Sequence, residues 1–415
     1  MANSFDRRTV LKMGGAAAAA LALPKPAFAD TTSINYWHHF TSQSEFAGLA
    51  AVMKQFAAAN PDIKVTQENI PNPEYMAKVT AAVVAKSVPD TTMIATERVA
   101  DLTAMSALID ITDRVNAWPQ KADFPDDRWK GITVDGKIYG IPAFTFVDWM
   151  YYRKDWFDAA GLKAPTTYAE FAEAAKKLTD AGKNRFGFSM RGGAGGGKYV
   201  IDVMEAFGAP LIKDGKIGLD RAPAIEALKW YSGLFTTDKV VPSSAPQDGF
   251  QQIMQAFQTG QTAMIWHHTG SFNDISKALK PGVEFATAGI PAGPSARVAR
   301  LAYSYNGLMK TDHADAAFKW IADWGSADAA VAFLAETGYF PAAPKVAQDQ
   351  RIAGNPLYAA AVETLGFGRL PPSFAGLAGW TDNTALPAFQ SILIGHSSVE
   401  DAVDQMIAGL EAATS

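Results

Sequence analysis

The chain lacks cysteine altogether, with none among its 415 residues. This absence excludes disulfide bonds, thiol catalysis, zinc sites with cysteine ligands and iron–sulfur clusters. It also excludes lipid attachment at an N-terminal cysteine. A chain without thiols tolerates an oxidising compartment, because no wrong bridge can form there.

The chain also lacks a block of basic residues. Its formal net charge is −5, and charged residues make up 19% of it. Nucleic-acid binding needs clustered Lys and Arg, so we expect no nucleic-acid partner. Hydrophobic residues reach 48% and aromatic residues 11%. These fractions predict a folded globular protein, and the length predicts about two domains.

Long hydrophobic runs are missing as well. The apolar stretch 13–23 is shorter than the roughly 20 residues that span a bilayer, which disfavours a membrane anchor. It follows the charged segment 6–12 and precedes Ala27-Phe28-Ala29, which predicts a signal peptide over 1–29 and a mature start near Asp30. The pair Arg7-Arg8 resembles a twin-arginine signal. We therefore expect a freely diffusing periplasmic protein, in a compartment without an ATP supply.

Strand and helix patterns alternate along the remaining chain. Strands are predicted at 33–37, 63–68 and 92–95, with helices at 45–59 and 74–86 between them. A second alternating region starts at 147–153 and continues with helices at 168–180, 200–207, 223–235 and 250–258. Strands at 263–266 and 301–309 and a helix at 314–324 follow. This order predicts an α/β fold with sheets covered by helices, and ligands at the carboxyl ends of the strands.

Several segments resemble, in order, the extracellular solute-binding protein family 1 of ABC importers, the family of maltose-binding protein. They are Pro89-Asp90, the run 135–142 (Asp-Gly-Lys-Ile-Tyr-Gly-Ile-Pro), Tyr152-Arg153-Lys154-Asp155, the helix start 165–171, Phe257-x-x-Gly260 with Ala263-Met264, and Gly338-Tyr339-Phe340-Pro341. Arg153 departs from the asparagine usual in this family.

The resemblance implies a type II periplasmic-binding-protein fold: two α/β lobes that close on a ligand by hinge motion. It places the crossovers near Pro142, Arg300 and Tyr339. One lobe would then comprise 30–142 with 300–338, and the other 143–299 with 339–415. The implied role is a monomeric, non-catalytic binding protein that needs no cofactor and passes a sugar-like ligand to the permease subunits of an ABC importer.

A carbohydrate site needs aromatic platforms for C–H faces beside polar side chains for hydroxyls. Such mixtures occur where strands end or crossovers fall. The candidate ligand-binding residues are His38, His39, Thr41, Glu97, Thr145, Asp148, Arg191, Gly192, Trp266, His267, Tyr303, Asn306, Arg369 and Trp380. Each has a plainer alternative: aromatic residues at strand ends also pack in cores, Glu97 and Arg98 could form a surface pair, and Arg191 could cap a helix.

Two other functions stay open at this stage. The pairs His38-His39 and His267-His268 admit a metal carrier, although adjacent strand residues point to opposite faces and no acidic cluster accompanies them. A periplasmic hydrolase could be built on Asp148 and Glu97, but no nucleophile motif is present. The glycine-rich run 192–198 lacks the Ser or Thr of a phosphate-binding loop. Together with Arg191 and Arg369, it keeps acidic sugars and polyols open as ligands.

Overall fold

The structure is a computed structural model that describes residues 31–124, 126–343, 350, 354–365, 368–372 and 374–414. The predicted signal peptide, 1–29, lies outside these residues. Within them, no helix combines the length and the apolar character of a membrane span.

One continuous path of strands runs through the whole molecule, in the order β2-β1-β3-β12-β6-β10-β7, with β11 and β13 also paired to β6. β1 is parallel to β2 and β3, and β12 is antiparallel to β3 and β6. The strands are β1 (Thr32–His38), β2 (Ile63–Asn69), β3 (Thr91–Ala95), β6 (Ile141–Tyr152), β7 (Phe186–Ser189), β10 (Thr262–His268), β11 (Ala286–Ala288), β12 (Leu301–Leu308) and β13 (Phe340–Pro341). Two small hairpins pair β4 (Thr133–Val134) with β5 (Lys137–Ile138) and β8 (Ile212–Lys213) with β9 (Lys216–Ile217).

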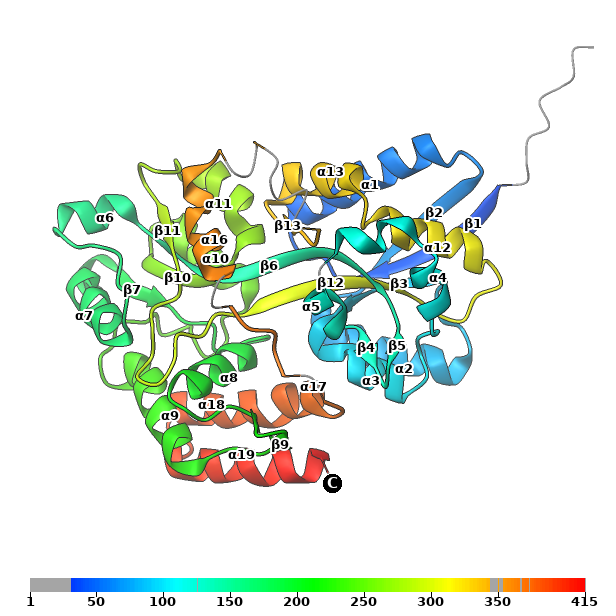
Figure 1. Ribbon diagram of the computed structural model, residues 1–415. Helices are drawn as coiled ribbons and strands as arrows, with labels where there is room; N and C mark the ends of the chain where they lie inside the picture. Colours follow the sequence, from blue (N-terminus) through cyan, green and yellow to red (C-terminus); the bar gives the residue numbers. More distant parts are fainter. Residues whose placement is uncertain are drawn as a thin grey trace, which may run out of the picture.

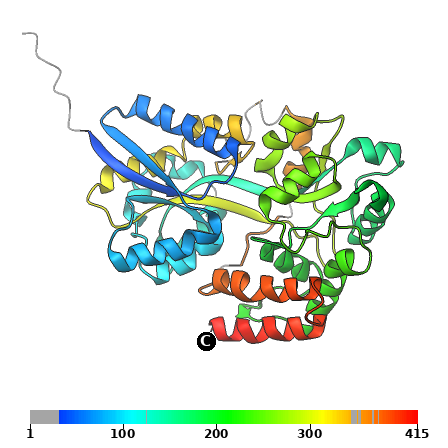
Figure 2. The same ribbon diagram turned by 180° about the vertical axis from the view of Figure 1, so that it is seen from behind.

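β6 belongs to the sheets of both lobes. Its residues 141–147 pair with β12, and Asp148 to Tyr152 pair with β10. Nearly every β6 side chain is buried, including Pro142. Figure 2 shows β6 and β12 passing side by side between the two halves of the molecule. The two lobes are therefore joined through backbone hydrogen bonds of shared strands as well as through loops.

Helices cover both faces of the first lobe's sheet. α1 and α13 lie on one side, and α2 and α3 on the other (Figure 1). α1 starts with a capping box in which the Ser42 hydroxyl accepts from the Glu45 amide. The helices here are α1 (Gln43–Ala59), α2 (Tyr75–Ala85), α3 (Val99–Ala104), α4 (Thr112–Asn116), α5 (Asp126–Lys130), α12 (Ala314–Asp323) and α13 (Ala327–Thr337).

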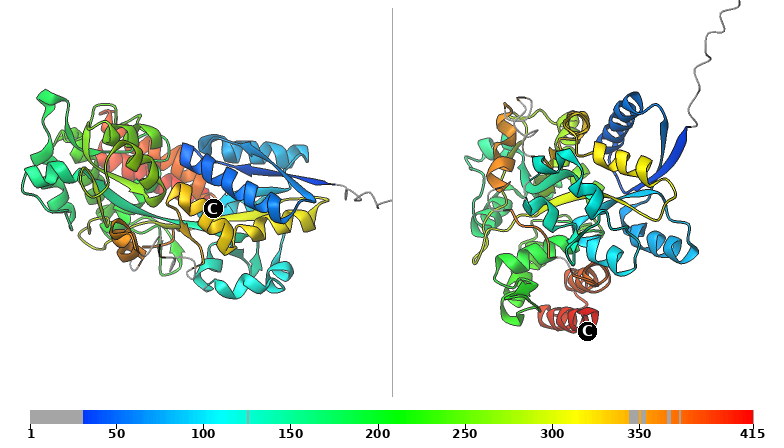
Figure 3. Two further views of the ribbon diagram at one scale, coloured as in Figure 1. Left: turned by 90° about the horizontal axis from the view of Figure 1, so that it is seen from above. Right: turned by 45° about the vertical axis from the view of Figure 1, so that its right-hand side comes forward.

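The second lobe is richer in helices. α10, α11 and α16 lie on one side of its strands, and α8, α9, α18 and α19 on the other (Figure 1). The left view of Figure 3, from above, shows the two lobes side by side. The helices are α6 (Lys154–Ala159), α7 (Tyr168–Leu178), α8 (Gly197–Ala206), α9 (Arg221–Thr236), α10 (Phe250–Gln258), α11 (Phe272–Ala278), α16 (Ala359–Leu365), α17 (Leu377–Trp380), α18 (Leu386–Leu393) and α19 (Val399–Thr414). A π-helical turn, η7 (Thr381–Ala385), joins α17 to α18.

The hydrophobic core is divided in the same way. One cluster combines buried residues from 34–147 with others from 301–343. A second combines residues 150–299 with 377–410. A smaller third cluster contains Trp149 and Ile265 together with Leu334 and Phe340, and it lies where the lobes meet. Each lobe thus has a core of its own. Burying one large apolar side chain in such a core contributes about 1.5–3 kcal/mol to the stability of that lobe.

Candidate functional site

The carboxyl ends of strands from both lobes meet at one surface, which we call the interlobe surface. β1 and β3 of the first lobe end there in His38 and in the turn η2 (Thr96–Arg98). β10 of the second lobe ends there in the turn η5 (Thr269–Ser271). The Gln251 side chain of α10 donates to the Thr41 carbonyl across this surface at 3.0 Å. In α/β proteins, ligands bind at the carboxyl ends of the strands, which makes the interlobe surface the candidate ligand site.

Charged side chains gather at the interlobe surface, and Arg98, Asp148 and Arg300 are buried among them. The Lys198 ammonium lies 2.9 Å from the Asp148 carboxylate, and the guanidinium of Arg300, at a predicted crossover, lies 3.6 Å from Asp202. Electrostatic interactions link these pairs to further charged groups from both lobes. We define the interlobe charge cluster as these eight residues: Glu97, Arg98, Asp148, Arg191, Lys198, Asp202, Arg300 and Asp382.

Local structure places the two close pairs. Asp148 stands where β6 changes partner, and its amide donates to the carbonyl of Arg300, the residue just before β12. Lys198 and Asp202 are four residues apart in α8, so both reach the same side of that helix. Burial raises the pKa of Asp202 to about 6, although Arg300 opposes the shift. Burial also lowers the pKa of Lys198, against the attraction of Asp148.

A narrow cavity adjoins the pairs, lined by Asp148, Asp202 and Arg300 together with Tyr168, Tyr199 and Trp266. It has about 10 Å³ of space for the centre of a water molecule, which is about the room that one water needs. Pockets for small organic ligands measure about 300–1,000 Å³. An organic ligand of ordinary size therefore does not fit this cavity.

The first histidine pair is held within its own lobe. The His38 ring is buried and bonds Gln67 through Nε2 at 2.7 Å, while its Nδ1 accepts from the Phe40 amide. The His39 ring lies edge-on to Tyr75 at 5.1 Å, and its buried Nδ1 has no partner among the described residues. Burial lowers the pKa of both rings, and the charge of Arg98 lowers that of His39 further.

The second histidine pair lies at the end of β10. His267 bonds the Ser271 hydroxyl at 2.6 Å. His268 is opposite Asp148 in the strand register and packs among the rings of Phe146, Phe250 and Tyr339. Burial lowers the pKa of both rings well below its usual value, and the charge of Lys198 lowers it further. Both imidazoles are therefore neutral at pH 7.

The glycine-rich run positions Arg191. The Arg191 Nε donates to the Ala194 carbonyl at 2.8 Å, and its guanidinium lies over the Phe250 ring. A Cβ at Gly195 would lie 2.1 Å from the Arg191 guanidinium, so the glycine makes room for it. Gly192 contributes backbone only: its amide donates to Ala245. The run thus holds an arginine at the start of α8.

Six predicted site residues lie away from the charge cluster or inside the cores. Thr145 donates to the Ala302 carbonyl, Asn306 accepts from Tyr36, and the Trp380 indole donates to the Met406 carbonyl. The other three are Trp266, which packs on Tyr168 and Phe171 and lines the cavity; Tyr303, whose ring lies under Arg128; and Arg369, an exposed partner of Glu205.

The structure brings together Glu97, Asp148 and Arg191 from the prediction. It adds Lys198, Asp202, Arg300 and Asp382 to them, and Phe250 and Tyr339 beside His268. The spacing of Lys198 and Asp202, in a helix whose only other charged residue is Glu205, was a usable signal, because charges are rarely placed on a buried face without a partner. The local sequence around Arg300 contains no comparable pattern that would have predicted its pairing with Asp202.

The lobes touch directly beside the second histidine pair. The Tyr339 hydroxyl donates to the Glu45 carboxylate at the start of α1, and its ring stacks on Phe144 at 4.9 Å. A Cβ at Gly270 would lie 1.9 Å from the Tyr339 ring. The ring therefore lies flat against the Gly270 backbone with no room for a side chain.

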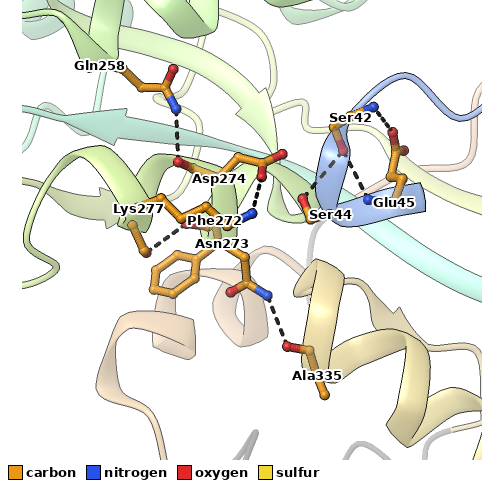
Figure 4. Close-up of polar contacts among 10 residues, drawn as sticks. Ser42, Ser44, Glu45, Gln258, Phe272, Asn273, Asp274, Lys277 and Ala335 are labelled. Carbon is orange, nitrogen blue, oxygen red and sulfur yellow. Dashed lines mark hydrogen bonds and ion pairs between the residues drawn. The ribbon is translucent and has the colours of Figure 1, made fainter. Parts of the chain in front are cut away.

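Figure 4 shows the neighbouring contact, with the start of α1 facing α11. Ser42 and Glu45 form the capping box of α1, and the Asn273 amide of α11 donates to the Ala335 carbonyl of α13 at 3.3 Å. Asp274 pairs with Lys277 within α11. Polar contacts between helices of the two lobes thus flank the packing of Tyr339 on Gly270.

Metal binding has little structural support. No three His, Cys, Asp or Glu side chains within the described ranges are grouped so that they could hold a metal ion. His38 and His267 each use a ring nitrogen within their own lobe.

Comparison with known proteins gives consistent results. The chain is 27% identical to a binding protein of Brucella abortus (strain 2308) over 83% of this chain and 84% of that one. It is 29% identical to the maltodextrin-binding protein MdxE of Bacillus subtilis (strain 168) over 64% of each. A solute-binding protein of an ABC transporter from Thermotoga lettingae TMO, solved with alpha-D-tagatose bound, matches with a TM-score of 0.85 at 20% identity, covering 92% of this chain and 100% of that one.

The structural match confirms the predicted two-lobed α/β fold. The model of the family described as bacterial extracellular solute-binding protein matches residues 41–332, which is well over half of the sequence. The chain belongs to the bacterial extracellular solute-binding proteins.

Proposed function

We propose that this chain captures a sugar or sugar-derived ligand between its lobes and delivers it to the permease subunits of an ABC importer. The observation that carries the proposal is the interlobe surface, where strand ends of both lobes meet, Gln251 bonds Thr41 across it, and the rings of His268 and Tyr339 stack. Polar groups of this kind bind hydroxyls, and rings such as Phe250 pack on C–H faces. The maltodextrin and tagatose of the similar proteins belong to the same chemical class.

The lobes and the route of export are part of the proposal. We infer a twin-arginine signal over 1–29, a monomeric periplasmic product, and lobes of 30–142 with 300–338 and of 143–299 with 339–415. In support, Arg300 directly precedes β12, and β6 changes partner a few residues after Pro142. The ligand site combines the cluster residues with His39, Thr41 and His268.

The proposal includes no catalysis. Glu97 and Asp148 lie in different lobes, and Asp148 is paired with Lys198. The ion pair with Lys198 occupies the Asp148 carboxylate and keeps it from acting freely on a bound substrate. A hydrolase built on these two residues therefore has no support from the structure, and neither does a metal carrier.

A ligand screen tests the proposal. Mature protein is melted with a panel of mono- and oligosaccharides and polyols, and tryptophan fluorescence is recorded in parallel. A ligand at a hundred times its Kd adds about 2.7 kcal/mol of stability, which raises the melting temperature by several degrees.

Matched variants assign the effect to the site. Arg191→Ala should weaken binding at least tenfold. Arg221→Ala should leave the affinity unchanged, because Arg221 is an exposed residue of α9 that pairs with Asp404 of α19. A panel without any shift in melting or fluorescence would contradict the proposed function.

A further inference from the structure

The four cations of the interlobe charge cluster are of two kinds. Lys198 and Arg300 each form an ion pair with an aspartate. Arg98 and Arg191 form no ion pair with any carboxylate of the described residues; their hydrogen bonds go to carbonyl and amide oxygens. Because the two arginines come from different lobes, each lobe brings one positive charge without a direct counter-charge to this surface.

Arg98 is held in place by uncharged groups. It is only 7% exposed. Its Nη2 donates to the Asn72 carbonyl at 2.9 Å, and its guanidinium lies over the Tyr75 ring at 4.8 Å. Its Nη1 is buried and has no hydrogen-bond partner within the described chain. Buried guanidinium groups are ordinarily paired with an anion, so Arg98 has both a donor and a charge left to use.

Arg98 lies where the two lobes touch. It ends η2, which follows β3 and lies against α17 of the second lobe. Close by, the Gly376 amide donates to the Asp101 carboxylate across the lobes at 2.8 Å. His39, at the end of the neighbouring strand β1, packs on the same Tyr75 ring, and its buried Nδ1 is likewise unpartnered among the described residues. Two unused polar atoms of the first lobe thus lie near each other at the interlobe surface.

The nearby carboxylates are engaged elsewhere or exposed. Asp148 is paired with Lys198 at 2.9 Å, the charge of Glu97 acts on Arg300, and Asp382 is exposed to solvent. Their charges reach the two unpaired arginines only from beyond ion-pair distance, and solvent weakens such attraction. An anion in contact with either guanidinium would therefore displace no existing partner.

An oxyanion suits Arg98 better than a hydroxyl group does. A hydroxyl oxygen would accept a hydrogen bond from Nη1, but it would leave the charge of the buried guanidinium without compensation. A carboxylate or phosphate oxygen accepts the same bond and supplies the counter-charge. Charge-assisted bonds of this kind are stronger than neutral ones, and the planar guanidinium matches the geometry of both groups.

We propose that Arg98 is a ligand-binding residue of the first lobe, and that it binds an anionic group, a carboxylate or a phosphate, of a sugar-derived ligand. Arg191 adds a second positive charge from the other lobe. The inference rests on the proposed function, because it names the class of ligand and one further residue for that site. Within the range that the sequence left open, it selects acidic sugars and sugar phosphates over neutral sugars and polyols.

Matched ligands test the class by calorimetric titration at pH 7.5 and constant ionic strength. Glucose, galactose and mannose are each compared with their uronic acid and their 6-phosphate. For each set that binds, we expect the acid or the phosphate to bind at least tenfold more tightly than the neutral sugar, and the comparison distinguishes the two anions. A neutral sugar that binds as tightly as both of its anionic partners overturns the inference while supporting the proposed function. A panel in which neither neutral nor anionic members bind overturns the proposed function, and the inference with it.

Substitutions assign the preference to Arg98. Arg98→Gln keeps an amide donor but removes the charge, so the affinity for the anionic ligand should fall at least thirtyfold, while that for its neutral partner changes less than threefold. Arg114→Gln is the control, since Arg114 is an exposed residue of the same lobe that pairs with Asp315; it should change neither affinity.

A second variant keeps the test decisive if Arg98→Gln does not fold. Arg98→Lys preserves the charge but not the planar fork, so the affinity for the anion should fall at least fivefold and more than that for the neutral sugar. Circular dichroism and melting establish which variants fold. A purely structural role of Arg98 would lower both affinities alike. A preference for the anion that is undiminished in the folded variant overturns the inference.

Discussion

The two histidine pairs stand at corresponding places, each at the end of a strand, yet their surroundings differ. His38 and His39 contact side chains of their own lobe, among them Gln67 and Tyr75. His268 instead stacks on Tyr339, whose hydroxyl binds Glu45 at the start of α1. The first pair therefore stabilises one lobe. The second pair lies at the contact between the two lobes, so its surroundings change when the lobes move relative to each other.

The strongest test of this difference is Gly270→Ala, in the turn just after the second pair. The new methyl group would lie 1.9 Å from the Tyr339 ring, which Phe144 and Glu45 hold in place. We expect the lobes to be propped apart, ligand affinity to fall more than tenfold, and the radius of gyration with ligand to stay larger than in the parent protein. Small-angle scattering and titration measure both.

Gly233→Ala provides the matched control, because a Cβ at this position in α9 has no atom within 4 Å. It should change neither quantity. If Gly270→Ala closed and bound ligand like the parent, the interlobe role of the second pair would be wrong.

A smaller effect separates the members of each pair. His38→Ala removes ring bonds to Gln67 and to the Phe40 amide and leaves a cavity, so the free energy of unfolding should fall by about 2–4 kcal/mol. His39→Ala loses packing on Tyr75 but no bond of Nδ1, so we expect about 1 kcal/mol. Urea denaturation with a common m-value measures both. Equal decreases in the free energy of unfolding would show that the hydrogen bonds of His38 do not stabilise the lobe more than the packing of His39.

The smallest effect is the pH dependence of stability. Burial depresses the pKa of His268 in the folded protein, whereas the unfolded chain takes up the proton near pH 6.5. The unfolded state then binds more protons below pH 6.5, so this contribution to stability is full above that pH and is lost as the pH falls. His268→Gln should remove at most about 1.4 kcal/mol per pH unit of that loss between pH 6.5 and 5.5.

Asp202 provides an opposing contribution to check. Its pKa is raised to about 6, so the folded state holds a proton that the unfolded state has already released between pH 4 and 6. That contribution is present at low pH and is lost as the pH rises through about 6. Denaturation of Asp202→Asn at several pH values should therefore show a steeper loss of stability on acidification than the parent. A shallower slope would contradict this sign.

Much of the fold could be predicted from residue patterns. The helix predicted at 250–258 coincides with α10, and the strand expected at 63–68 lies within β2. These segments have a clear period or a clear stop, such as Gly260. The full length of β6 was missed because its side chains are buried on both faces, so no alternation remains to be seen. Pro142, near which the resemblance places a crossover, lies inside this strand.

The sequence predicts a surface for the ligand site but not which side chains face it. The rule that ligands bind at strand ends predicted His39, Glu97 and Arg191 as ligand-binding residues, and their role stays a prediction. It could not distinguish Trp380, whose indole donates to Met406 in the core, from an aromatic ring in the cleft. The partner of a buried charge, such as Arg300 for Asp202, depends on tertiary contacts between distant segments and is not visible in local sequence.

The shared strands also dictate the order of assembly during translation. β12 lies between β3 and β6 in the sheet, although more than two hundred residues separate it from β3 in sequence. The first lobe's sheet cannot be completed until the ribosome has released residues 301–308, by which time most of the second lobe has emerged. Pairing over such a long loop is slow, because closing the loop costs entropy before contacts form. The nascent chain therefore exposes the unpaired edge of β3 throughout much of its synthesis, and an unpaired edge of this kind favours aggregation until it is covered.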